Sequence, residues 1–200
     1  MKKLLALTLS LLLVFSMAAC GEKAAEFEPG KISGTRYESA FAGIVCELGS
    51  DWKFMSEEEI RENNKIAADL AGEEYTKAIQ QMTNVTDMMA NRSNGTDTVL
   101  VAFEKVVSTS EQKYAEASKE NMQKSLESMG MTNVTVTIGK GTFAGEEHVS
   151  IDVSAKYSGF DIYEKCAVVK CGKYMMIVTA CTWNTNSCQS VLDKFKKIAE

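Results

Sequence analysis

Val99-Leu100-Val101-Ala102-Phe103 is the stretch that decides the fold of this 200-residue chain. Successive side chains of a β-strand point to opposite faces of its sheet, and here both sets are apolar. Such a continuous apolar run is typical of a strand that is covered on both faces. We therefore expect a buried strand over 98–107, with helices lying over it.

A long helix is expected directly after this strand. Ser108 and Glu111 have the spacing of a capping box, in which two side chains satisfy free N–H groups of the first helical turn. Apolar residues then recur at helical spacing up to Met129 and stop before Gly130, a residue type that often follows a helix end. The sequence predicts a helix over about 108–129.

A second helix start lies upstream. Ser56 can cap, Glu59 can form the reciprocal bond, and Met55 can pack on Ile60 across the first turn. One or two helices are expected over 57–82. Further glutamates stand at positions 57, 58 and 62. Negative charge suits the start of a helix, and a cation site is the alternative interpretation.

Most of the remaining chain has the pattern of strands joined by short turns. The expected strands cover 37–41, 43–48, 52–54, 85–91, 98–107, 134–138, 149–157, 160–169 and 173–182. The last two form a hairpin around Cys171-Gly172, because glycine readily adopts a positive φ. A closing helix is expected over 187–199. Since hairpins dominate, the predicted class is α+β, with a largely antiparallel sheet covered by helices.

The composition supports one globular domain and excludes a disordered chain. The hydrophobic set makes up 45% of the residues, and there is a single proline. The formal net charge is −5, and lysines and arginines form no run. Binding to a phosphate backbone needs a basic surface, so we expect no nucleic-acid partner.

The first twenty residues have the pattern of a secretion signal. Lys2 and Lys3 precede an apolar stretch over 4–19, which meets Cys20 and then polar chain. This stretch is shorter than the roughly 17–25 residues of a transmembrane helix. An uncleaved anchor and an ordinary cleaved secretory peptide are the alternatives.

The junction Met17-Ala18-Ala19-Cys20-Gly21 resembles the lipobox of bacterial lipoproteins, although leucine is usual where Met17 stands. The resemblance implies a diacylglyceryl thioether on the Cys20 sulfur, with acyl chains such as palmitate, and cleavage before Cys20. It also implies retention on the outer side of the membrane. The acidic mature chain is repelled by anionic headgroups, so the lipid on Cys20 is its expected contact with the membrane.

These observations divide the chain into three parts. Residues 1–19 are expected to be the lipoprotein signal peptide. Residues 20–35 are expected to be the lipidated N-terminus and a flexible tether, which contains Pro29. Residues 36–200 are expected to form a single α+β domain.

Three segments carry a resemblance to a known family. Tyr37-Glu38-Ser39, the segment from Trp52 to Ile60 and Ala144-Gly145-Glu146-Glu147-His148 resemble small lipoproteins of clostridia-like bacteria that have a Mog1/PsbP-like fold. The resemblance covers most of 36–199. It implies an α/β/α sandwich, and it implies an accessory or binding role rather than catalysis.

Few residues of the domain match a catalytic or metal-binding pattern. The single histidine, His148, cannot form a multi-histidine metal site, and we expect it at the surface or rim. The glycine-rich stretch 139–145 leads into a strand, which favours turns over a phosphate site. Trp52 and Trp183 line a cleft or belong to the core, and the methionines are expected in the core rather than at a copper site.

Five cysteines lie beyond the junction, at positions 46, 166, 171, 181 and 188. None has C-x-x-C spacing, and an odd number leaves at least one thiol free within the chain. With Cys171-Gly172 as the turn, Cys166 and Cys181 are roughly 13 Å apart, too far for a disulfide. Cys181 and Cys188 are the most plausible pair. Buried, inert thiols are nevertheless the default expectation, and the redox state stays open.

The sequence therefore predicts a lipid-anchored extracytoplasmic protein of the cell membrane. We expect a non-catalytic binding or accessory module of the cell envelope, whose partner is an unidentified ligand or envelope protein. No catalytic, cofactor-binding or metal-binding residue is assigned, and no cofactor; the one site residue is Cys20. The alternatives are a thiol-dependent redox enzyme or hydrolase and a carboxylate-based metal-binding lipoprotein.

Overall fold

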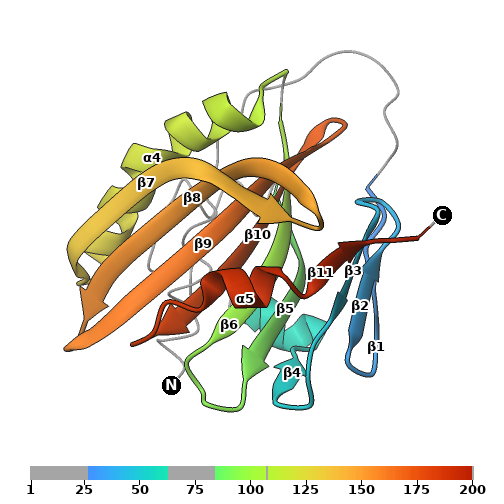
Figure 1. The fold of residues 1–200 in the computed structure, drawn as a ribbon, viewed down its shortest axis with the longest axis horizontal. Helices are drawn as coiled ribbons and strands as arrows, with labels where there is room; N and C mark the ends of the chain where they lie inside the picture. The colour runs from blue at the N-terminus through green and yellow to red at the C-terminus, as the bar shows by residue number, and fades with distance from the viewer. Residues whose placement is uncertain (1–26, 63–83, 107, 200) are drawn as a thin grey trace.

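A computed structural model describes residues 27–62, 84–106 and 108–199. These residues form two antiparallel sheets (Figure 1). The larger sheet comprises β4 (Trp52–Phe54), β5 (Asn84–Arg92), β6 (Thr98–Lys105), β7 (Thr132–Phe143), β8 (Glu146–Tyr157), β9 (Phe160–Cys171) and β10 (Tyr174–Trp183). The smaller comprises β1 (Lys31–Ser33), β2 (Arg36–Ser39), β3 (Ile44–Glu47) and β11 (Phe195–Lys197). The helices are α4 (Glu111–Ser128) and α5 (Cys188–Leu192). The predicted α+β class with a largely antiparallel sheet is confirmed.

Strand β6 is an interior strand of the large sheet, whose order is β4-β5-β6-β10-β9-β8-β7. All five side chains from Val99 to Phe103 are fully buried. Leu100 and Ala102 belong to the core on the side of α4, whereas Val99, Val101 and Phe103 belong to the core on the other side. The prediction of a strand covered on both faces is confirmed.

Helix α4 covers one face and lies across β7, β8 and β9 (Figure 1). The predicted cap was wrong by two residues, since Ser110 and not Ser108 accepts the bond, from Lys113 N. The predicted end is confirmed. Gly130, at φ 86°, donates to Glu127 O, and Met131 donates to Leu126 O, which is the Schellman pattern of a glycine-ended helix.

The opposite face is covered mainly by the small sheet and α5, where we expected helices (Figure 1). The predicted closing helix over 187–199 was also wrong, because α5 ends at Leu192 and the chain continues as β11. Phe195 is buried and pairs with Cys46 of β3. Pairing with a distant strand therefore overrides the helical spacing of this segment.

The helix start at 57 forms as predicted. Glu59 Oε2 accepts a bond from Ser56 N at 2.8 Å, and Glu59 N donates to Ser56 Oγ at 3.3 Å, which completes the capping box. Met55 packs against the core cluster that contains Ile60. The remainder of the helices expected over 57–82 lies outside the described residues from position 63 onward.

The β9–β10 hairpin is shifted by two residues from the predicted register. Cys171 pairs with Tyr174, so the turn is Gly172-Lys173, with Gly172 at φ 58°. Glycine tolerates the positive φ at the first turn position. Cys166 consequently lies opposite Thr179 rather than Ile177, and Cys181 opposite Glu164 rather than Ile162.

Part of the expected tether is packed on the domain. The ring of Phe27 contacts those of Phe41, Phe103 and Tyr174, with centroids 5.5, 5.0 and 5.9 Å away. Strand β1 pairs with β2. The aromatic partners of Phe27 are distant in sequence, so the local composition could not reveal this packing and the stretch was assigned to the tether.

Candidate functional site

Asp87 lies at a β-bulge on β5. The register between β5 and β6 shifts between Thr86 and Met88, which leaves Asp87 without a partner in the ladder. An extra residue in one strand bends it locally and redirects a side chain. The carboxylate of Asp87 meets the small sheet and the segment that leads into it.

Two donors hold this carboxylate. The Tyr37 hydroxyl donates to Asp87 Oδ2 at 2.7 Å, and Gly30 N lies 3.0 Å from both carboxylate oxygens. Burial raises the pKa of Asp87, and the two hydrogen bonds oppose that rise. Burial, and then the charge of Asp87, also raise the pKa of Tyr37.

A cavity of about 750 Å³ opens beside Asp87. Its lining comes from the segment before β2, from β4 and the following helix start, and from β5: Pro29, Gly30, Ile32, Lys53, Phe54, Met55, Ser56, Glu57, Glu59, Ile60, Val85, Thr86 and Asp87. We call it the Asp87 cavity. Its volume is in the range of small-molecule sites, about 300–1,000 Å³. It combines apolar walls with few charged groups, which is typical of a binding site.

The charged groups of the cavity are mainly acidic. Among the described lining residues, Asp87, Glu57 and Glu59 are acidic and Lys53 alone is basic. The Lys53 ammonium is exposed and lies 3.7 Å from Glu59 Oε1. Asp87 forms no ion pair among the described residues, so its charge is not compensated there.

The sequence did not indicate this site. Asp87 stands in a stretch correctly predicted as a strand, and a bulge has no sequence signature here. Cys20, the one predicted site residue, lies outside the described residues.

His148 occupies a rim position on β8, as expected. Its Nδ1 lies 3.2 Å from Glu111 Oε1, and the Glu111 carboxylate also accepts from Lys170 N at 3.0 Å. Glu111 thus joins the first turn of α4 to β8 and β9. The arrangement holds the helix on the sheet, and a second carboxylate, that of Glu146, lies 3.9 Å from His148 Nε2.

The glycine-rich stretch is only partly a turn, which corrects the prediction. Gly139 and Gly141 lie within β7, opposite Ser150 and His148. Only Gly145, at φ 86°, belongs to the turn between β7 and β8. The strand extends further than expected because β8 pairs along its full length, with a shift near its start.

All five cysteines beyond the junction are free, so the suggested Cys181–Cys188 disulfide is absent. Burial raises the pKa of Cys46 to about 12 and that of Cys171 and Cys188 to about 11. It also raises the pKa of Cys166 and Cys181. A thiol with a raised pKa carries little thiolate at neutral pH and is a poor nucleophile.

The methionine pairs lie in the core on alternating faces. Met89 and Met175 belong to the core beside α4, whereas Met88 and Met176 belong to the core beneath the small sheet. Neighbouring thioethers therefore point apart. Among the described residues, no group of three or more His, Cys, Asp or Glu side chains is placed to hold a metal ion.

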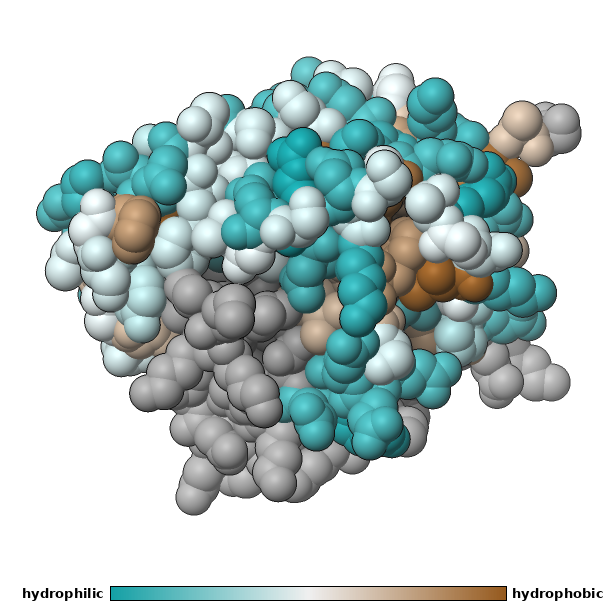
Figure 2. Space-filling model, turned by 90° about the horizontal axis from the view of Figure 1, so that it is seen from below, coloured by the Kyte–Doolittle hydropathy of each residue, from teal (hydrophilic) through white to brown (hydrophobic). Residues whose placement is uncertain are grey.

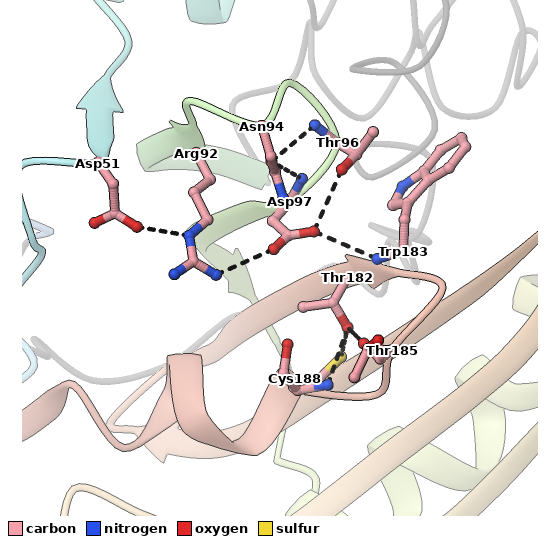
Figure 3. Close-up of polar contacts among 10 residues, drawn as sticks. Asp51, Arg92, Asn94, Thr96, Asp97, Thr182, Trp183, Thr185 and Cys188 are labelled. Atoms are coloured by element: carbon pink, nitrogen blue, oxygen red, sulfur yellow. Dashed lines mark hydrogen bonds and ion pairs between the residues drawn. The ribbon is translucent and has the colours of Figure 1, made fainter.

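A polar network at one end of the large sheet ties three segments together (Figure 3). Arg92 Nε donates to Asp51 at 2.7 Å, and Arg92 Nη1 lies 3.4 Å from Asp97. Asp97 also accepts from Trp183 N at 3.4 Å. The Arg92 guanidinium stacks over Trp52, 5.7 Å from the ring centroid. Neither tryptophan lines the Asp87 cavity, and we interpret this network as structural.

A row of polar residues that the sequence analysis missed crosses the buried sheet. Asn91, Thr98, Cys181 and Glu164 are successive partners on β5, β6, β10 and β9. Asn91 Oδ1 and both carboxylate oxygens of Glu164 are buried without a hydrogen bond in the structure. The sequence did contain a signal for Glu164. Glu164 and Cys166 are two positions apart in β9, so their side chains lie on the same, buried face of the strand.

On the face seen in Figure 2, the described residues form no broad apolar area. Seen from below, hydrophilic residues surround small, separate hydrophobic areas (Figure 2). Among the described residues, Ile32 and Phe160 are the exposed large hydrophobic side chains. Within the same residues, no helix has both the length and the apolar character needed to cross a membrane.

Comparison with known proteins assigns no family to this α+β domain. No family model and no curated protein matches the chain. A similar solved structure is that of LpqN, described as involved in cell envelope biogenesis of Mycobacterium tuberculosis. The match has 10% sequence identity and a TM-score of 0.40, and it covers 76% of each chain. A likeness of this size carries no assignment of fold family or function.

Proposed function

We propose that this chain is a lipid-anchored protein on the extracytoplasmic face of the cell membrane and acts there as a non-catalytic binding module. The observation that carries the proposal is Met17-Ala18-Ala19-Cys20-Gly21 after an apolar stretch with a basic start. The Asp87 cavity is the proposed ligand site. A Mog1/PsbP-like architecture is part of the proposal and is supported by the three segments that resemble that family.

The position of Phe27 sets how far the domain extends from its anchor. Six residues separate Cys20 from Phe27, whose ring packs on the domain. Seven Cα–Cα steps span at most about 25 Å. On this proposal, the aromatic cluster around Phe27 stays within that distance of the lipidated residue, so the domain works close to the bilayer.

Metabolic labelling with an alkyne analogue of palmitate tests the anchor. The full chain is expressed in a bacterium with a lipoprotein pathway, followed by membrane fractionation and mass spectrometry of the N-terminal peptide. We expect a label on Cys20, a mature chain that begins there, and recovery with membranes. Cys20→Ala is expected to abolish labelling.

Cys171→Ala is the matched control, because it removes a cysteine outside the junction. This variant is expected to retain the label and the membrane fraction. An unmodified Cys20 with the leader still attached, or an unlabelled chain in the medium, would contradict the proposed anchor.

A further inference from the structure

The Asp87 cavity carries an inference about ligand chemistry that rests on the proposed binding function. Among the described residues, three carboxylates and one ammonium group line it, and that ammonium already lies 3.7 Å from Glu59. The described part of the lining is therefore acidic on balance. A ligand that enters it meets more negative than positive charge.

Asp87 is the most consequential of these carboxylates because it is partly withdrawn from water. Its donors, Tyr37 and Gly30, are both uncharged. A carboxylate accepts about four hydrogen bonds, so acceptor capacity is left beside these donors. Burial raises the pKa of Asp87, which is the expected response of a carboxylate that lacks a nearby cation.

The apolar residues of the lining indicate what the uncharged part of the ligand is. Ile32, Phe54, Ile60 and Val85 supply apolar surface from three separate segments. Apolar walls around a charged group suit a ligand with a cationic end and an apolar body. An anionic ligand is disfavoured, since it approaches a carboxylate without a counter-charge.

From this juxtaposition we infer that the Asp87 cavity binds small organic cations, in which an ammonium or guanidinium group pairs with Asp87 and an apolar group packs against Phe54 and Ile60. The contact forms a charge-assisted hydrogen bond in a site partly shielded from solvent. Such bonds are about twice as strong as neutral ones. The inference concerns recognition and includes no chemical step.

Three probes of one shape test it: benzylammonium, benzyl alcohol and benzoate. The full chain is purified as the cell processes it and is reconstituted in nanodiscs if it carries lipid, with protein-free nanodiscs as the blank. Methyl NMR of ¹³C-labelled methionine follows Met55 in the lining and Met122 on α4 as an internal reference. We expect Met55 to shift, with a Kd for benzylammonium roughly tenfold below that for benzyl alcohol and with benzoate weakest.

Asp87→Asn is expected to remove this preference, so that the ammonium and alcohol probes bind equally. Glu120→Gln, at an exposed carboxylate on α4, is the matched control and is expected to keep it. Tyr37→Phe keeps the Asp87 charge and is expected to keep the preference too. If Asp87→Asn does not fold, the comparison of the three probes on the unmodified chain still decides the matter.

Equal affinities for benzylammonium and benzyl alcohol on the unmodified chain overturn the inference, as does a preference that survives Asp87→Asn in a folded variant. Absence of any shift at Met55 also overturns it. None of these results bears on lipidation of Cys20, which the labelling experiment decides separately.

Discussion

Glu164 on β9 lies directly opposite Cys181 on β10, and its buried carboxyl group receives no N–H or O–H hydrogen bond from the described residues. Burial raises the pKa of Glu164 from an ordinary value of 4.5 to about 8. The thiol of Cys181 opposes this rise and is too weak a donor to cancel it. The side chain is therefore neutral in the folded protein at pH 7.

The raised pKa of Glu164 predicts a loss of stability between about pH 5 and pH 8. Above pH 4.5 the unfolded chain releases this proton while the folded chain retains it, so rising pH favours unfolding until the folded pKa of about 8 is passed. The contribution is on the order of a few kcal/mol at pH 8. Thermal melts at pH 5, 6, 7 and 8 measure it.

Glu164→Gln is expected to weaken this pH dependence and to raise the Tm at pH 8. The amide has a similar shape and does not titrate. Asp87 also has a raised pKa and adds a dependence of the same sign, so a residual slope is expected in the variant. Parallel pH profiles for the two proteins would contradict the assignment to Glu164.

Removal of the Glu111 side chain is expected to destabilise the domain. Its carboxylate accepts from Lys170 N at 3.0 Å, more weakly from Val149 N at 3.5 Å, and lies 3.2 Å from His148 Nδ1. Glu111→Ala leaves these groups without their acceptor, at a cost of about 1–3 kcal/mol. Urea unfolding measures the change in free energy.

Glu120→Ala provides the control for that measurement. Glu120 is exposed on the same helix and, among the described residues, pairs with Lys124 alone, so its loss is expected to cost less than about 0.5 kcal/mol. Equal effects of the two substitutions would argue against a special role of Glu111 in holding α4 on the sheet.

Gly30→Ala is expected to disturb the contact between the two sheets. A Cβ atom at this position would lie 2.5 Å from a Tyr37 ring carbon and 2.9 Å from Asp87 Oδ2, too close for either neighbour. We expect a loss of about 1–3 kcal/mol in urea unfolding. Gly139→Ala is the control, since its Cβ would meet Ser150 Oγ at 3.5 Å, an ordinary contact.

The cysteines are expected to react slowly in the folded protein. Their raised pKa values and burial predict labelling by a disulfide reagent at least about tenfold slower than in the unfolded chain, with half-buried Cys171 the fastest. Labelling in buffer and in denaturant, followed by mass spectrometry, measures this difference. A cysteine that reacts faster than a free thiol would favour a redox enzyme.

Local signals in the sequence predicted the elements that depend on near neighbours. The Ser56–Glu59 capping box and the Gly130 helix end formed as expected because all partners lie within a few residues. The second capping box did not form. Glu111 instead binds strands that are distant in sequence, and this choice cannot be read from spacing.

The helix predicted in place of β11 was wrong because this segment also depends on a distant strand. Val191 and Leu192 fit a short helix, but Phe195 pairs with Cys46 of β3, about 150 positions earlier in the chain. The Asp87 cavity was unpredictable for a similar reason. It requires a bulge on β5, the Tyr37 hydroxyl from β2 and the backbone of Gly30, which meet only when the two sheets pack.

The amino-acid sequence by itself determined the alternation of buried strands, the helix boundaries with local caps and the antiparallel α+β class, because these follow from side-chain periodicity and nearest-neighbour hydrogen bonds. It also contains the Cys20 junction on which the proposed anchor depends. Only the tertiary structure decided which layer covers the second face, where Glu111 binds, and that Asp87 lines a cavity without a cationic partner among the described residues. Those outcomes depend on contacts between segments far apart in the chain, whose packing selects one pairing among several that local propensity permits.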